Sequence, residues 1–219
     1  MTTTDIRIKF SVKFLPIIAL FKADVEIRYY LEGIRIEPAP KGGIYLVASE
    51  GHRLAVIYDK AGTMTGSDGV ILRISPELIR ASKVRSPLSP GFDLNVLATG
   101  DRVSIANDFG QEHSDMETFI QPGKPWIMGN YPNWRRLLPN FPKLKPGFSE
   151  SVNGEFLADY AKIKTKNKTL AFWQAKGSNQ IVVQHIGVPE MVSIIMPMRV
   201  SEQDTKARAV MFNQFPQKP

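Results

Sequence analysis

The chain has 219 residues, of which 43% are hydrophobic and 22% charged, which is enough for a packed core in one or two domains. It contains no cysteine, so disulfides and thiolate metal sites are excluded and a reducing compartment is favoured. The formal net charge of +7 permits binding to polyanions, although a charge surplus that only aids solubility explains it equally well. We see no signal-peptide pattern, and the apolar run at residues 14–21 is too short to span a bilayer, so we expect a cytoplasmic protein.

One strand, one short helix and three strands recur as a pattern along the chain. Alternation of apolar and charged residues predicts the first strand, and Pro16 suits the first turn of the helix that follows. Gly42 and Gly43 form a turn between two of the later strands. The first pass is predicted, in chain order, at residues 6–10, 14–23, 27–37, 44–49 and 53–58.

The second pass begins with a strand that leads into a helix capped by Ser75. Thr99, Gly100 and Asp101 are typical of a hairpin turn between two of its strands. The strand, the helix and the three following strands are predicted at residues 70–74, 76–83, 93–98, 102–107 and 115–121.

A proline-rich connector at residues 122–147 carries Trp126, Tyr131 and Trp134, so we expect it to pack on the protein surface. In the third pass Asn153 caps a helix. This helix and three strands are predicted at residues 154–163, 170–175, 181–186 and 192–200, followed by a polar tail.

The end of the last predicted strand, Ile194-Ile195-Met196-Pro197-Met198-Arg199, has an unusual composition. Proline cannot donate to a strand ladder, so the strand must lie at a sheet edge or end here. Methionine side chains are flexible and polarisable, and they suit surfaces that accept apolar ligands. The combination indicates a peptide-binding pocket rather than a catalytic site.

Four motifs resemble one known family, the bacterial replicative sliding clamp, which is the beta subunit of DNA polymerase III. In the family's order they begin at Val25, Val47, Tyr131 and Ile195, and they read VEIRYYLEG, VASEGHRLA, YPNWRRLLP and IMPMR. The sequence departs from the usual motif at two positions, Glu50 in place of Asp and Trp134 in place of Tyr.

The resemblance implies an α+β sliding-clamp (DNA clamp) fold, with three βαβββ units whose helices lie on one face of antiparallel sheets. Residues 1–124 correspond to the complete middle domain of the family, 125–147 to the connector, 148–200 to the second half of the last domain, and 201–219 to a flexible tail. The first domain and the front half of the third are absent. This shortened form suggests a phage or mobile-element origin.

The resemblance also implies a pocket that binds short motifs of polymerases or other replication and repair proteins. The simpler alternatives are that His52 is structural and that Leu31, Leu54 and Ile194 belong to the core. The residues carried over to the pocket are Leu31, Ser49, Gly51, His52, Arg53, Leu54, Pro132, Arg136, Leu137, Ile194, Ile195, Met196, Pro197, Met198 and Arg199.

Basic residues on and after two helices are candidates for non-specific contact with double-stranded DNA, because family members line their central hole with helices. The alternative is that lysines at a helix C-terminus only offset the helix dipole. The candidates are Arg80, Lys83, Arg85, Lys162, Lys164, Lys166 and Lys168.

We expect a binding protein and not an enzyme, with no cofactor and no metal. No phosphate-binding glycine loop or nucleophile motif occurs. A metal nuclease at Asp108, Glu112 and Asp115 and a tail segment, residues 208–212, that occupies the pocket are weaker alternatives. We expect a homo-oligomer, either a ring that acts as a processivity factor or two copies paired through their third units. The competing hypothesis is an adaptor or competitor that offers the pocket without encircling DNA.

Overall fold

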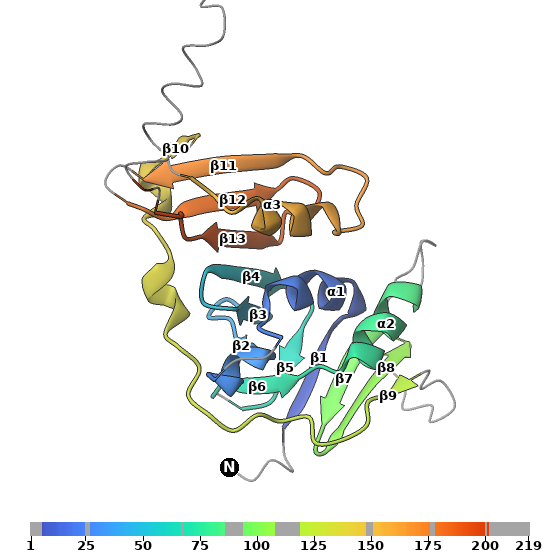
Figure 1. Ribbon diagram of the computed structural model, residues 1–219. Helices are drawn as coiled ribbons and strands as arrows, with labels where there is room; N and C mark the ends of the chain where they lie inside the picture. The colour runs from blue at the N-terminus through green and yellow to red at the C-terminus, as the bar shows by residue number, and fades with distance from the viewer. Residues whose placement is uncertain are drawn as a thin grey trace, which may run out of the picture.

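The protein is described by a computed structural model in which three βαβββ units follow one another (Figure 1). All strand pairings are antiparallel among the residues described, and they build one sheet of five strands and one of eight. The described residues are 6–24, 27–66, 68–85, 94–107, 119–147, 151–175, 178–199 and 201.

The first unit starts with β1 (Arg7–Ser11), and a helical segment follows in which 3-10 turns η2 (Val12–Phe14) and η3 (Ala19–Phe21) flank α1 (Leu15–Ile18). Pro16 lies in the first turn of α1, as predicted. Three strands complete the unit, and Gly42 and Gly43 turn the chain between two of them with φ values of 85° and 76°. These strands are β2 (Gly33–Pro38), β3 (Ile44–Ser49) and β4 (Arg53–Asp59).

The second unit follows the short strand β5 (Thr63–Met64) and contains β6, α2, β7, β8 and β9. Ser75 accepts a hydrogen bond from the Leu78 amide at 3.1 Å, so it caps α2 as predicted. Gly100 and Asp101 connect β7 to β8 as the predicted hairpin turn. The elements span Val70–Arg73, Pro76–Arg85, Leu94–Thr99, Arg102–Asn107 and Phe119–Ile120.

The third unit contains β10 (Leu144–Pro146), α3 (Gly154–Ala161), β11 (Leu170–Ala175), β12 (Ile181–His185) and β13 (Met191–Ile195). The Asn153 side chain accepts from the Glu155 amide at 2.9 Å and caps α3, as predicted. The short strand β10 lies inside the expected connector and supplies the first strand of this unit.

The two sheets have the strand orders β5-β1-β7-β8-β9 and β10-β11-β12-β13-β4-β3-β2-β6. The eight-stranded sheet therefore runs from the third unit into the first without interruption, because β13 pairs with β4 (Figure 1). One large core joins the inward faces of both sheets to the α1 segment and to Tyr160 and Ile163 of the third unit.

Two expected elements differ from the structure. Residues 27–32 do not extend β2: Ile27 is 97% exposed, and Tyr29–Glu32 form a 3-10 turn, η4, closed by the Leu31 amide on the Arg28 carbonyl at 2.8 Å. The strand predicted at residues 192–200 ends at Ile195, before Pro197, and it lies inside the sheet rather than at an edge. The strand predicted at 115–121 is described only at Phe119–Ile120.

Candidate peptide-binding surface

The pairing of β13 with β4 brings together the two motifs that the sequence placed in one pocket. Ile194 lies opposite Leu54, and Ile195 lies opposite Arg53. One further hydrogen bond, from the Met196 amide to the His52 carbonyl at 2.8 Å, extends the contact past the end of the strand. Pro197, which has no amide hydrogen, follows where the ladder has ended.

A small apolar cluster covers the side of this seam that faces away from the helices, which we call the peptide face. Leu54 and Ile194 belong to it, and Trp134 from the connector packs on them with only 5% of its surface exposed. The Trp134 ring meets Tyr45 edge to face with centroids 5.8 Å apart, and the Arg135 guanidinium lies 4.3 Å from its ring centroid. The cluster consists of Val47, Leu54, Val56, Trp134 and Ile194, with Tyr45, Tyr131, Leu137 and Leu138 around it.

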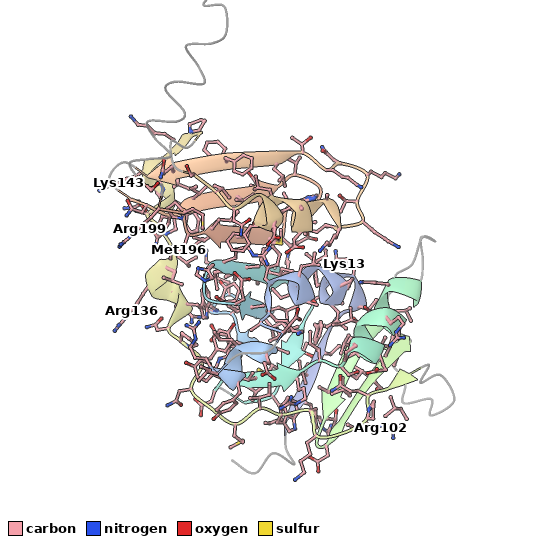
Figure 2. All side chains as sticks on the ribbon, in the orientation of Figure 1. Lys13, Arg102, Arg136, Lys143, Met196 and Arg199 are labelled. Carbon is pink, nitrogen blue, oxygen red and sulfur yellow. The ribbon has the colours of Figure 1, made fainter. Side chains whose placement is uncertain are left out.

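The connector reaches the peptide face as a 3-10 turn, η6 (Trp134–Leu137), which places Leu137 on the cluster and leaves Arg136 exposed. Arg136, Met196 and Arg199 lie along the same edge of the molecule (Figure 2). Met198 is 49% exposed, and Pro132 is exposed as well. The structure thus gives the peptide face an apolar base with proline, methionine and arginine side chains around it.

The turn between β3 and β4 is held by its own side chains. The Ser49 hydroxyl donates to the Arg53 carbonyl at 2.6 Å and accepts from the Gly51 amide at 3.0 Å. The Glu50 carboxylate accepts from the Arg53 amide at 2.6 Å. Burial raises the pKa of Glu50, and the Arg53 charge opposes this only in part. Gly51 has a φ of 101°, which a residue with a Cβ rarely adopts.

Arg53 lies on the opposite side of the sheet, which we call the helix face, because alternate residues of a strand point to opposite faces. It is 7% exposed and donates to Glu50 at 3.1 Å, to Asp159 of α3 at 2.7 Å and to the Leu20 carbonyl at 3.2 Å. Its guanidinium also lies over the rings of Phe21 and Phe156. These bonds occupy Arg53 in joining the first and third units.

Ile195 also points to the helix face and belongs to the main core. Leu31 is 1% exposed within η4. His52 is exposed and stacks on Phe156 of α3, with ring centroids 6.2 Å apart. The expected pocket residues therefore divide between the two faces of the sheet.

Some residues near the β3–β4 turn were not among the peptide-binding residues predicted from the sequence. A Cβ on Gly51 would lie 2.8 Å from the Arg28 guanidinium, so the side chain that precedes η4 reaches the β3–β4 turn. Tyr29 is 53% exposed and meets Tyr30 edge to face. Two adjacent tyrosines within a family motif could have indicated these residues, but we predicted a strand there and did not select them.

Only some of the predicted DNA-contacting residues lie together on the helix face. Lys83, Lys162 and Lys164 line one cleft, which Lys13 joins from the first unit. Arg80 is exposed and pairs with Glu77 at 3.5 Å, while Lys166 and Lys168 are exposed beyond the cleft. Arg85 ends α2, and its side chain lies outside the described part.

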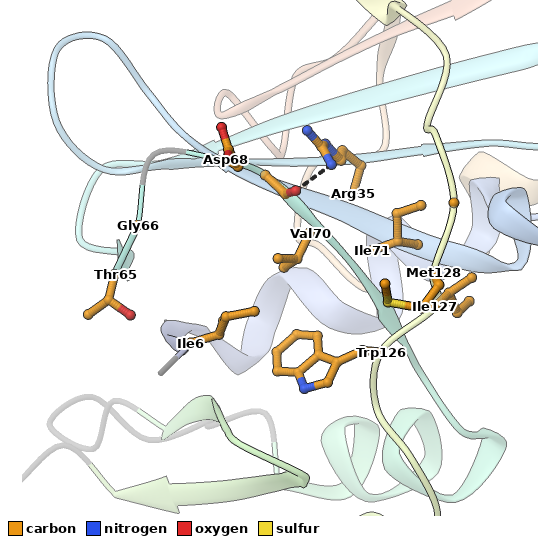
Figure 3. A pocket seen from close by; sticks show the side chains of 12 residues that line it. Ile6, Arg35, Thr65, Gly66, Asp68, Val70, Ile71, Trp126, Ile127 and Met128 are labelled. Carbon is orange, nitrogen blue, oxygen red and sulfur yellow. Dashed lines mark hydrogen bonds between the residues drawn. The ribbon is translucent and has the colours of Figure 1, made fainter. Parts of the chain in front are cut away.

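A separate cavity of about 300 Å³ lies between β6 and the connector (Figure 3). Trp126, Ile127 and Met128 line it on one side, and Arg35 donates to the Gly69 carbonyl across it at 2.5 Å. It contains none of the residues predicted to bind peptide or DNA, so it forms no part of either surface.

Within the described part of the chain, no three His, Cys, Asp or Glu side chains gather as metal ligands would. The acidic residues Asp108, Glu112 and Asp115, considered above for a nuclease, lie outside the described residues, as does the tail segment 208–212. His185 is buried, and burial lowers its pKa. No helix in the described ranges has the length and apolarity that a membrane crossing requires.

Solved structures of bacterial DNA polymerase sliding clamps have a similar architecture. A clamp from Pseudomonas aeruginosa aligns with a TM-score of 0.61 at 15% identity, over 89% of this chain and 67% of that chain. A clamp from Bartonella birtlesii bound to griselimycin gives 0.62 at 17% identity, over 89% and 66%. The Helicobacter pylori beta clamp bound to a DNA ligase peptide gives 0.59 at 14%, over 90% and 66%. No protein-family model and no curated protein sequence matches the chain.

The architecture and these likenesses define the chain as an α+β protein with the sliding-clamp fold, which confirms the fold predicted from the motifs. More particularly, it is similar to a shortened beta subunit of bacterial DNA polymerase III, and it spans about two thirds of the length of the solved clamps.

Proposed function

We propose that the protein is a clamp-like, non-enzymatic component of DNA replication or repair in the cytoplasm. Its peptide face receives short apolar motifs carried by polymerases or other DNA-processing proteins. The observation that carries this proposal is the β13–β4 seam, because it joins the Gly51–Leu54 motif, the connector and the Met-Pro-Met-Arg segment at one surface.

The chemistry of the peptide face suits a peptide with apolar anchors. Methionine and leucine side chains adapt to the shape of a bound residue, and exposed Met198 and half-buried Leu137 offer such contacts. The exposed guanidinium groups of Arg136 and Arg199 can donate to carbonyl or carboxylate oxygens of the same peptide. The ligase peptide bound to the Helicobacter pylori clamp supports a ligand of this class.

Contact with double-stranded DNA through the basic residues of the helix face is a second part of the proposal. Lysines at such positions would hold phosphates without reading sequence, so the binding would be weak and sensitive to salt. A processivity factor would additionally need to encircle the duplex.

The sheet topology argues against one way of closing a ring, and this supports the adaptor. Within the chain, the last strand of the third unit pairs with the last strand of the first unit, β13 with β4. Because β4 is paired with β3 on one side and with β13 on the other, it has no free edge that could pair with a second copy of the chain. The joint that links the units therefore cannot be repeated between chains, and we infer that the protein presents its peptide face without a ring closed by this joint.

Fluorescence polarisation with a labelled Gln-Leu-Ser-Leu-Phe peptide tests the peptide proposal. Met198→Ala should weaken binding about fivefold, as expected for an exposed apolar contact worth about 1 kcal/mol. Ile186→Ala is the matched control, since Ile186 is 41% exposed near the opposite end of β13. Absence of binding, or equal weakening by both changes, would refute the proposal.

A further inference from the structure

A second surface lies on the helix face, in a cleft of about 550 Å³. The α1 segment, the ends of α2 and α3, and the turn between β12 and β13 bound it. Residues from all three units thus meet there. Its volume lies in the range of sites that enclose a small ligand or one unit of a larger one.

The rim of the cleft is positively charged, with four lysines against one glutamate. Lys13 pairs with Glu190 at 3.0 Å, and Lys162 pairs with Asp159 at 2.5 Å. Lys83 and Lys164 are exposed, and neither makes an ion pair with another described side chain. Two cations therefore remain for a ligand, and the other two add to the local potential.

The base of the cleft is aliphatic. Pro16, Leu20 and Pro189 are at least partly exposed there, and buried Ile17 and Val188 lie behind them. Lysine ammonium groups above an aliphatic base suit a molecule that carries phosphates next to a flat, weakly polar group, which would pack there by van der Waals contact.

We propose that this cleft binds single-stranded DNA, with phosphates at Lys83 and Lys164 and one base against Pro16, Leu20 and Pro189. Every cation of the rim is a lysine, a compact point charge that can hold a phosphate without imposing one geometry on it. A duplex keeps its bases stacked inside, so it could touch the rim but not the base of the cleft. A single strand can turn a base outward.

This proposal extends the DNA contact proposed above and is independent of the peptide face, which lies on the other side of the sheet. Fluorescence anisotropy with labelled 12-nucleotide oligo-dT, a 12-base-pair duplex and a glutamate-rich peptide, each at about 50 mM salt, separates the ligands. We expect oligo-dT to bind about fivefold or more tightly than the duplex, and the acidic peptide to bind least.

The variant Lys83→Gln/Lys164→Gln should weaken oligo-dT binding about tenfold and reduce its salt slope by about 1.4, because two phosphate contacts are lost. Lys41→Gln/Lys143→Gln removes the same charge at exposed lysines outside the cleft and should change binding less than about twofold. Pro189→Ser should weaken oligo-dT binding without changing the salt slope.

Equal affinity for the duplex, equal losses in the two double variants, or tighter binding of the acidic peptide would each overturn the proposal. Equal affinity for the duplex would still leave the proposed duplex contact standing. None of these outcomes affects peptide binding at the opposite face.

Discussion

Ile194 lies directly opposite Leu54 in the antiparallel pairing of β13 with β4, and both side chains are buried under the connector. The same pairing joins the third unit to the first and forms the base of the peptide face. A change that loosens the joint between the units should therefore also alter peptide binding.

Arg53→Met should lower the free energy of unfolding by about 2–3 kcal/mol, because Glu50 and Asp159 lose their shared cation in a largely buried position. Urea denaturation followed by circular dichroism measures it. Arg73→Met is the control: its partner Glu32 lies 3.8 Å away and half of its side chain is exposed, so we expect a loss of about 0–1 kcal/mol. Equal losses would contradict the joining role of Arg53.

Tyr160→Phe should cost about 1–2 kcal/mol, since its hydroxyl shares a buried 2.6 Å hydrogen bond with Ser193 of β13. Burial also raises the pKa of Tyr160, so the hydroxyl stays protonated. A double-mutant cycle with Ser193→Ala should give a coupling of about 1 kcal/mol. Tyr58→Phe is the control: it removes an exposed hydrogen bond to the Gly42 carbonyl and should cost less than about 0.5 kcal/mol. A coupling near zero between Tyr160 and Ser193 would show that their hydrogen bond does not stabilise the protein.

Asn153→Ala should destabilise the protein by about 1 kcal/mol through loss of the α3 cap, and Asn153→Ser should retain most of the stability. Asn140→Ala provides the comparison, because Asn140 precedes the 3-10 turn Phe141–Lys143 without a side-chain capping bond. Thermal unfolding measures the stability of all three variants. If Asn140→Ala proved as harmful as Asn153→Ala, the capping bond would not be the cause.

Acid should destabilise the protein partly through Asp159. Burial alone would raise its pKa, but hydrogen bonds from Lys162 and Arg53 outweigh burial and hold the pKa below the ordinary value. Its contribution is therefore complete above the ordinary pKa near 4 and disappears as the pH falls through the lower folded value. Urea unfolding at pH 3, 4, 5 and 7 should show a shallower pH dependence for Asp159→Asn than for the parent, and an unchanged dependence would contradict this assignment.

Light scattering coupled to gel filtration at micromolar concentration should show no ring closed by the β13–β4 joint, since β4 is already paired on both sides within one chain. A dimer paired through third units would agree with the topology, because such a pair does not use β4. A species of four copies or more, retained on nicked circular DNA but not on linear DNA, would instead establish the ring.

Local chemistry made much of the fold predictable. Ser75 and Asn153 cap helices, and glycines turn hairpins, because these effects act within a few residues. Strand β10 was missed, since the three residues Leu-Lys-Pro give no alternation and proline counts against a strand. The pairing of β13 with β4 depends on contacts between distant segments, and only the resemblance indicated that they meet.

The sequence did not indicate which face of the sheet each candidate peptide-binding residue would occupy. Alternation along β4 already places Arg53 and Leu54 on opposite faces, yet adjacency in a motif grouped them as one wall. Lys13 was not predicted, because nothing local connects it to the lysines after α3. Whether the peptide residues act together stays a prediction.

Hydrogen exchange with and without the Gln-Leu-Ser-Leu-Phe peptide shows which face of the sheet binds the peptide, because amides covered by the peptide gain protection. We expect added protection in amides of residues 51–54, 133–137 and 196–199, with residues 154–163 of the helix face unchanged. Protection confined to residues 154–163, or no change at saturating peptide, would contradict it.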